Sequence, residues 1–243
     1  MQDPATAPPS RPLLLLVLLA FVAGLVDVTG WLTFDGLFTA QVTGNLVLLA
    51  AGLKGGDPPA VARILAVPVF MASLALGCLA AGLWPDRRGR TLLLSGQTLL
   101  LLLVWLSMLL SSVAGRAPKL PLAAAMLAVA TIGLQCALVR GVLHDGQATS
   151  VMTSNLVTVV VSAITLLQPG TGNPRDAKEK LHRTLPVVLA FVAGCPVGAL
   201  SVARLGPAWC WAIPVLASLV ALAAGRVAPH DRRLQSLEAR PVP

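Results

Sequence analysis

Gly24-Leu25-Val26-Asp27 lies inside an apolar run that covers about residues 13–34. This run is close to the roughly 20 residues that a helix needs to cross about 30 Å of hydrocarbon. Seven further apolar segments follow, at about residues 37–53, 64–84, 92–113, 120–139, 149–167, 185–203 and 209–225. Continuous apolar runs lack the alternation of barrel strands, and backbone in lipid must pair within a helix or a closed barrel. The sequence therefore predicts an all-α, polytopic transmembrane helix bundle with six to eight membrane segments.

The composition excludes an ordinary water-soluble domain. Hydrophobic residues make up 56% of the 243 residues and charged residues 12%, a balance that a core with a solvated surface does not normally show. The formal net charge of +8 raises the question of nucleic acid. However, the Lys and Arg residues fall in the tails, the connections and the segment ends, where anionic lipid headgroups attract them. We expect the lipid bilayer as a partner and no nucleic acid.

The chain is expected to form one domain between two tails. Residues 1–12 contain four prolines and are predicted to be a disordered N-terminal tail. Residues 13–227 form the transmembrane domain, and residues 228–243 form a cytoplasmic C-terminal tail. The first apolar run continues to Trp31 and has no A-x-A cleavage site, so we interpret it as an uncleaved span and not as a signal peptide.

Four short matches in the same order indicate an internal repeat. The matched pairs are Gly24-Leu25 with Gly133-Leu134, Phe38-Thr39-Ala40 with the weaker Ala148-Thr149-Ser150, Thr43-Gly44-Asn45-Leu46 with Thr153-Ser154-Asn155-Leu156, and Gly77-Cys78 with Gly194-Cys195. We place repeat one at about residues 13–113 and repeat two at about 120–227. The second and sixth segments are the shortest and carry polar clusters, which makes them candidates for broken or re-entrant helices.

The repeat leaves two topologies open. Eight crossings would form two parallel sets of four, whereas re-entry of the second and sixth segments would leave six crossings in two inverted sets of three. With the N-terminus inside, either topology puts 13 of the 18 Lys and Arg residues on the inner side. The positive-inside rule therefore predicts cytoplasmic termini in both cases and does not choose between them.

Asp27 is the first candidate for a functional residue, because it is the one acidic residue inside an apolar run. An ionised carboxylate at membrane depth costs about 2.5 to 3.5 kcal/mol on insertion scales, so it usually faces the bundle interior, a partner or a water-filled path. Two other interpretations stay open. Asp27 pairs with a cation such as Arg140 for assembly alone, or it lies near the interface and is solvated.

The repeated T-x-N clusters are the second candidate. Thr43, Asn45, Thr153 and Asn155 place side-chain oxygens near helix starts, where several transporter folds bind ions and substrates. The alternative is that these side chains join helices through interhelical hydrogen bonds. Either role fits the sequence.

Motifs of soluble enzymes are not apparent in this chain. The sequence has no phosphate-binding G-x-x-x-x-G-K-[ST] loop and no Ser-His-Asp pattern. Its four cysteines lie in or beside apolar runs without a C-x-x-C spacing, and its three histidines lie in polar connections or the tail. We therefore expect no enzymatic activity, no cofactor and no metal site.

The polar residues of the hairpins resemble a known family. Gly24-Leu25-Val26-Asp27, Phe38 and Thr43-Gly44-Asn45, with Gly133-Leu134-Gln135 and Thr153-x-Asn155-Leu156, are similar to the YoaK family of bacterial multi-pass membrane proteins. The resemblance spans nearly the whole chain and implies a polytopic helical fold in the bacterial inner membrane, but no substrate. Cys136 and Ser154 replace the Asn and Gly usual in the family, and Cys136 matches Asp27 in the repeat.

Two functional hypotheses follow. The first is a permease for a small solute or ion, with Asp27 as a proton or cation site and Thr43, Asn45, Gln135, Thr153 and Asn155 lining a cavity at the repeat interface. The second is a non-transporting scaffold or partner subunit. Small-residue rows at Ser73/Gly77/Ala81 and Ala190/Gly194/Gly198 allow close helix packing, within one chain or between the copies of a homo-oligomer.

Overall fold

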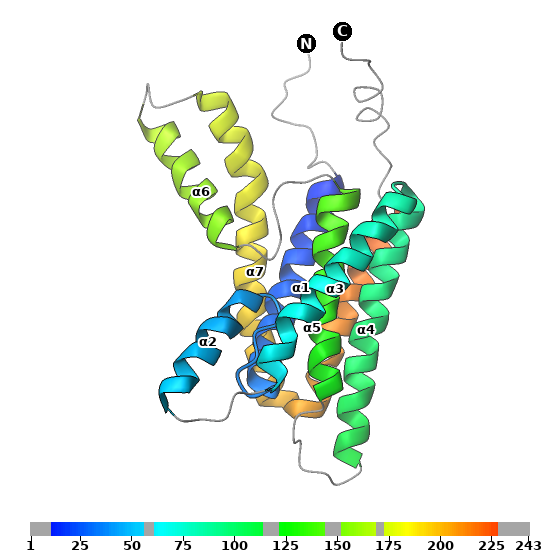
Figure 1. Ribbon diagram of the computed structural model, residues 1–243. Helices are drawn as coiled ribbons and strands as arrows, with labels where there is room; N and C mark the ends of the chain where they lie inside the picture. Colours follow the sequence, from blue (N-terminus) through cyan, green and yellow to red (C-terminus); the bar gives the residue numbers. More distant parts are fainter. Residues whose placement is uncertain (1–10, 56–60, 114–121, 144–151, 169–172, 228–243) are drawn as a thin grey trace.

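The computed structural model describes residues 11–55, 61–113, 122–143, 152–168 and 173–227. Regular structure in these ranges is helical throughout (Figure 1), which confirms the predicted all-α class. The elements are α1 (Arg11–Thr33), α2 (Val42–Gly55), α3 (Val61–Leu83), α4 (Arg87–Val113), α5 (Leu122–Ala137), the π-helical turn η2 (Leu138–Val142), α6 (Met152–Leu167), α7 (Pro174–Trp209) and α8 (Ala212–Val227). The predicted tails lie outside the described residues, apart from Arg11 and Pro12, which belong to α1.

Six helices run between the two ends of the bundle. Five of them, α1, α3, α4, α5 with its π-helical turn, and α7, are long and apolar enough to cross a membrane. The sixth, α8, has 16 residues but follows almost all of α1. Trp211 just before α8 stacks on Phe34 just after α1, and Gly225 near the end of α8 lies close to Leu15. The predicted polytopic bundle is therefore confirmed.

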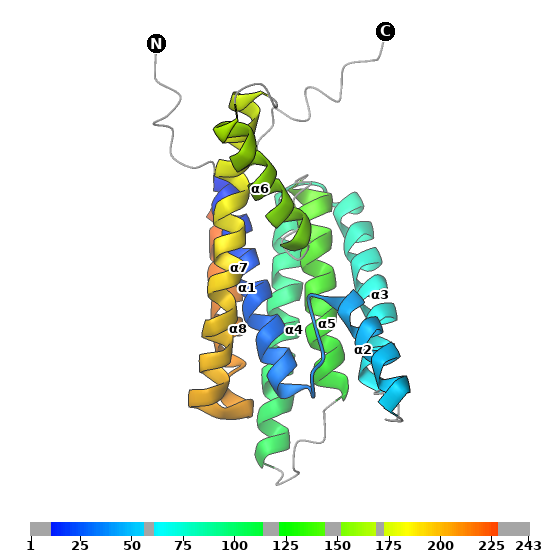
Figure 2. The ribbon, with the colours of Figure 1, turned by 90° about the vertical axis from the view of Figure 1, so that its left-hand side faces the viewer.

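The remaining helices, α2 and α6, do not run end to end. The backbone N–H groups of Thr39 and Ala40 reach Asp27, which lies six residues before the end of α1, or about 9 Å along its axis. The chain thus turns back into the bundle before α2 begins, and α2 then returns to the end at which α1 finished (Figure 1). At the opposite end, α6 lies beside the first part of α7 (Figure 2).

Close contacts at glycines fix the directions of the long helices. Gly24 of α1 lies against Phe191 and Cys195 of α7, and Gly198 lies further along both helices, against Leu25 and Thr29. Residue numbers rise together in this pair, so α1 and α7 are parallel.

A second parallel pair is formed by α3 and α5. Gly133 lies against Phe70 and Ser73, and Gly141 lies against Ala81. This pair runs opposite to α1 and α7 (Figure 1). The last two helices, α4 and α8, are antiparallel, because Leu94 lies close to Gly225 while the later Thr98 bonds to the earlier Ser218.

The structure corrects two boundaries. Residues 168–183 were predicted to be a connection, but α7 begins at Pro174, because the Asn173 side chain accepts a hydrogen bond from the Arg175 backbone and Pro174 suits the first helical turn. Similarly, α4 begins at Arg87 and not near residue 92, with the Asp86 carboxylate accepting from the Arg88 backbone. Both helices extend into charged sequence, which hydropathy alone assigns to loops.

The outer surface is apolar, as a lipid-facing surface should be. Large exposed side chains are frequent on α3, α4, α6 and α7, for example Leu76 at 65% and Leu110 at 69% exposure. The interior holds many small side chains, such as Ala20, Ala66, Ala124 and Ala128. Close helix packing with an apolar exterior is the pattern expected of a membrane bundle.

Candidate functional site

The Asp27 carboxylate holds the segment that leads into α2. One oxygen, Oδ1, accepts hydrogen bonds from the backbone N–H groups of Thr39 and Ala40, both at 2.8 Å, and from the Thr39 hydroxyl at 3.3 Å. The other oxygen, Oδ2, accepts from Nε2 of Gln41 at 3.4 Å. Asp27 is only 4% exposed. A buried carboxylate is therefore satisfied by four donors from the first hairpin, at the place where the helix dipole of α2 favours negative charge.

Asn45, in the first turn of α2, binds the same turn through its side chain. Its Oδ1 accepts from the Phe38 backbone N–H at 2.9 Å, and its Nδ2 donates to the Phe38 carbonyl oxygen at 2.8 Å. The Phe38 ring lies 4.4 Å from the Trp31 ring, centre to centre. Thr43, by contrast, is exposed. Of the first T-x-N cluster, the Asn thus faces inward and the Thr faces outward.

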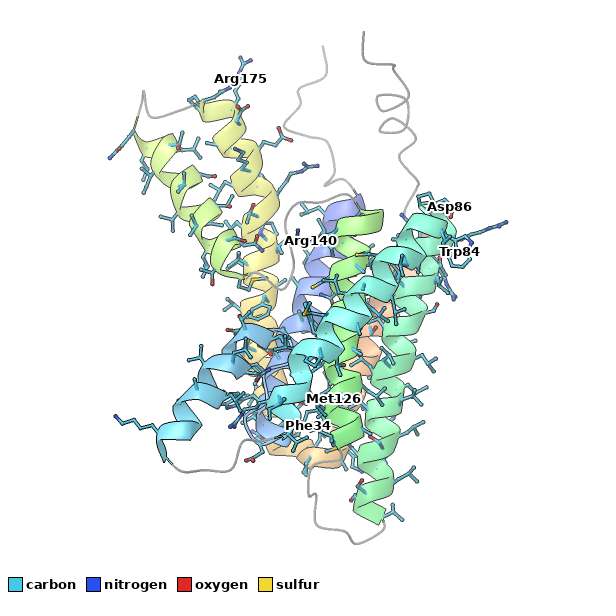
Figure 3. The ribbon with its side chains drawn as sticks, viewed as in Figure 1. Phe34, Trp84, Asp86, Met126, Arg140 and Arg175 are labelled. Carbon is cyan, nitrogen blue, oxygen red and sulfur yellow. The ribbon has the colours of Figure 1, made fainter. Side chains whose placement is uncertain are left out.

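The groups around Asp27 are suited to hold its own negative charge and differ from the ligands of a bound cation. The neighbours of the carboxylate are N–H and O–H donors, whereas a bound cation needs further oxygen ligands. Both oxygens of the carboxylate are thus satisfied by donors from the first hairpin. Arg140, its other predicted partner, is an exposed residue of η2 near the upper end of the bundle (Figure 3). The donors that Asp27 uses come from the hairpin.

The second half places its predicted residues in a similar pattern. Asn155 is buried at 2% exposure and Thr153 is exposed, as Asn45 and Thr43 are in the first half. Gln135 is fully buried, and its Nε2 donates to the Leu19 carbonyl oxygen of α1 at 2.9 Å. The preceding residues 144–151, which include the weak echo of the first hairpin, lie outside the described part of the chain.

The six predicted residues thus do not converge on one point. Asp27 and Asn45 bind the turn before α2, whereas Gln135 binds α1 at Leu19, eight residues or about 12 Å before Asp27 along the axis. None of the six lines a pocket that we describe. Thr43 and Thr153 face outward, so the T-x-N clusters contribute their asparagines and not their threonines to the interior.

Sequence reasoning missed Gln97 on α4. Its side chain is fully buried, and neither its amide nitrogen nor its amide oxygen has a hydrogen-bond partner among the described residues. The adjacent Thr98 hydroxyl lies 2.8 Å from the Ser218 hydroxyl of α8. The available signal was a single amide within the leucine-rich run of α4.

Ligands for a metal do not gather in the described ranges. No group of three or more His, Cys, Asp and Glu residues there could hold a metal ion.

Comparison with known proteins identifies the family of the chain. The family model described as "Protein of unknown function (DUF1275)" matches residues 15–224, from the first turns of α1 to α8. The chain belongs to this family. All six predicted site residues lie within the part of the chain that the DUF1275 model matches.

One relative of this DUF1275 member is a transmembrane protein of Bacillus subtilis (strain 168), named UPF0700 transmembrane protein YoaK. The two are 37% identical over 78 residues, which cover 30% of this chain and 35% of the relative. The match thus spans about a third of the relative's length. No solved structure matches the chain. The family supports the expected resemblance and a membrane location, and it leaves the activity to be argued from the site.

Proposed function

We propose that this DUF1275 member is a non-enzymatic permease for a small solute in the bacterial inner membrane, with six crossings in two inverted halves. The observation that carries the proposal is the pairing of the long helices. The first helix of each half, α1 or α5, runs parallel to the third helix of the other half, α7 or α3, and the two pairs have opposite directions. Halves related in this way exchange inward-facing and outward-facing states by rocking against each other.

Three further features support inverted halves. Gly24 contacts α7 and its sequence match Gly133 contacts α3, so matched residues make matched crossings. The short helices α2 and α6 lie at opposite ends of the bundle (Figure 2). Asn45 and Asn155 are buried on them in the same register after exposed threonines. Duplication of one inserted unit explains all three features together.

Asp27 gives the proposed permease a way to couple a proton to movement. Its ionised carboxylate accepts from residues 39 to 41. A protonated carboxyl group has less acceptor capacity, so it holds the turn before α2 less firmly. Proton binding would then favour a state in which the first hairpin is displaced.

Charge supports cytoplasmic termini. The end of the bundle where α1 begins and α8 ends also carries the connection from α3 to α4, with Trp84 and Asp86 (Figure 3). Arg11, Arg87, Arg88 and Arg226 therefore gather at one end, which the positive-inside rule assigns to the cytoplasm.

Sidedness is tested by single-cysteine labelling in a background without the native cysteines. Asp86→Cys should react with a membrane-impermeant maleimide only from the cytoplasmic side. The matched control is Lys54→Cys, since Lys54 is exposed at the other end of the bundle, and it should react only from the periplasmic side. Periplasmic labelling of Asp86→Cys would overturn the six-crossing arrangement.

Transport is tested with the purified chain in liposomes, by swelling in iso-osmotic solutions of amino acids, organic acids, sugars and amines. We expect at least one solute to enter faster than into protein-free liposomes, and Asp27→Asn to slow this entry without preventing reconstitution. Unchanged flux in Asp27→Asn would remove the coupling role of Asp27. Flux no faster than in protein-free liposomes for the whole panel would contradict the permease.

A scaffold or partner subunit, which would form a homo-oligomer through its small-residue rows, is the second candidate function. One observation favours it: both Asp27 oxygens are already occupied by hairpin donors, as an assembly role requires. In that case Asp27→Asn lowers the yield of folded protein or changes its oligomeric state, and there is no solute flux to alter.

A further inference from the structure

A pocket of about 270 Å³ lies at the end of the bundle where α1 ends, and opposite charges line it. Asp35 comes from the turn after α1 and Arg63 from the first turn of α3. The remaining lining is apolar and consists of Phe34, Leu37, Val61, Ala62 and Leu122. Phe34 marks this end in Figure 3. The pocket is thus small and mostly apolar, with one acidic and one basic side chain in its lining.

One nitrogen of the Arg63 guanidinium group forms a hydrogen bond, and another has no acceptor. Its Nη2 donates to the backbone carbonyl oxygen of Asp35 at 2.9 Å. Its Nε–H is buried and has no hydrogen-bond partner among the described residues. A buried guanidinium N–H without an acceptor is costly, and a carboxylate is the acceptor that best fits the planar edge of an arginine.

Asp35, the acidic residue of the pocket, lies in a turn with an unusual backbone conformation. It has φ of 52°, and the following Gly36 has φ of 71°. A Cβ atom at residue 36 would lie 3.2 Å from Nη2 of Arg63 and 3.4 Å from the Trp31 ring, so the turn needs glycine there. Asp35 is exposed, and its carboxylate forms no ion pair with Arg63 among the described residues.

We infer that this pocket binds a small zwitterion of the amino-acid class, with its carboxylate on Arg63, its ammonium group beside Asp35 and a short apolar side chain against Phe34, Leu37 and Leu122. A single anion would satisfy Arg63 but would face the Asp35 charge. A single cation would satisfy Asp35 but would leave the Arg63 Nε–H unpaired. A zwitterion is the small solute that satisfies both charges, and the apolar lining favours an aliphatic side chain.

This inference rests on the proposed function and deepens it by naming a substrate class. The pocket lies at the end opposite the cytoplasmic charges, beside the first hairpin, which suits capture of a solute for uptake. Binding and transport are measured separately. Binding without flux would refute the permease and keep the site, and flux of another solute without zwitterion binding would refute the site alone.

The test is calorimetric titration of L-leucine into the full chain in lipid nanodiscs at neutral pH. Wild-type protein should bind leucine. It should bind 4-methylpentanoate, which lacks the ammonium group, and isopentylamine, which lacks the carboxylate, more weakly. Arg63→Gln should weaken leucine binding about tenfold or more, because it removes a charge-assisted contact. Arg204→Gln, which removes an exposed arginine of α7 outside the pocket, is the matched control and should leave binding unchanged.

Asp35→Asn separates recognition from folding, because Asn tolerates the left-handed conformation as well as Asp does. It should weaken leucine binding about three- to fivefold, as expected for an exposed charge pair. Binding of 4-methylpentanoate should be unchanged or stronger, because the negative charge that faces its carboxylate is removed. Failure of folded wild-type protein to bind leucine would overturn the site. So would equal effects of Arg63→Gln and Arg204→Gln, or equal losses of leucine and 4-methylpentanoate binding in Asp35→Asn.

Discussion

The two short helices carry the same T-x-N pattern, yet the residue at the position of Asp27 differs between the two halves. The turn before α2 is tied to α1 by the buried carboxylate of Asp27 and clipped by Asn45. In the second half the position matching Asp27 is Cys136, which is buried at 6% exposure and has no carboxylate. There α6 lies along α7, which begins eleven residues earlier than its apolar run. The position of Asp27 thus holds a buried carboxylate in the first half and a buried thiol in the second.

The T-x-N pattern recurs with the same burial in α2 and α6, although the residue at the position of Asp27 does not recur. Asn45 and Asn155 are both buried, and Thr43 and Thr153 are both exposed, so the geometry of the pattern is retained. A carboxylate at the position of Asp27 is found in the first half only. Under the proposed coupling, protonation at this position therefore acts on the first hairpin.

The largest expected effect comes from removing the Asp27 carboxylate. Asp27→Ala leaves the N–H groups of Thr39 and Ala40 without acceptors in a buried place, which should lower the free energy of unfolding by about 3 kcal/mol. Thermal unfolding in detergent, followed by tryptophan fluorescence, measures this change. Cys136→Ala is the control in the second half and should have a much smaller effect. Equal losses would mean that the two halves are anchored alike.

Substitution of the glycines at the helix contacts should give the next largest loss of stability. A Cβ atom at Gly24 would meet the Phe191 backbone oxygen of α7, which cannot move without shifting the helix, whereas at Gly133 it would first meet the Ser73 hydroxyl. Gly24→Ala should therefore destabilise the protein by about 2 to 3 kcal/mol and Gly133→Ala by about 1 kcal/mol. The same unfolding assay compares them, and a reversed order would show that the α3 and α5 crossing is the tighter one.

Removing the Asn45 side chain should lower the free energy of unfolding less than removing the Asp27 carboxylate. Asn45→Ala removes two hydrogen bonds to Phe38, and we expect a loss of about 1 to 2 kcal/mol. Limited proteolysis at the connection after α1 should also become faster than in wild type, because the turn opens more often. Proteolysis at the wild-type rate would show that Asp27 alone holds the turn.

The smallest effect is expected at the exposed threonines. Thr43→Ala and Thr153→Ala should each change the free energy of unfolding by less than about 0.5 kcal/mol, since both side chains face outward. Unfolding curves that overlay the wild-type curve would confirm that only the asparagines of the T-x-N pattern support the fold. A loss as large as that of Asn45→Ala would contradict this division.

Much of the fold could be predicted because lipid imposes simple rules. Apolar segments of sufficient length located the helices, and the polar clusters identified α2 and α6 as the unusual ones. Charged helix ends were missed at Pro174 and Arg87, because hydropathy does not register capping by Asn173 or Asp86. Charge counting left two topologies open, and the proposed six-crossing arrangement is argued from the contacts of Gly24 and Gly133.

The candidate site was only half visible in the sequence. Asp27 was conspicuous as an isolated acid, but its donors are backbone N–H groups, which every residue carries and no pattern marks. Arg63 and Asp35 lie 28 residues apart, on either side of α2, so only the fold brings them together. Gln97 was passed over because one amide in a leucine run gives no hint of whether it has a partner.

The short spacing between Asp27 and its donors has a consequence for biogenesis. The N–H groups that bind the carboxylate follow it by only 12 and 13 residues. A helix that released this acid into lipid by itself would face an insertion cost of about 2.5 to 3.5 kcal/mol, and the compensating groups are the next part of the chain to be synthesised. We therefore expect α1 to remain at the membrane-insertion machinery until the start of α2 has emerged, so that the two enter the bilayer as one hairpin.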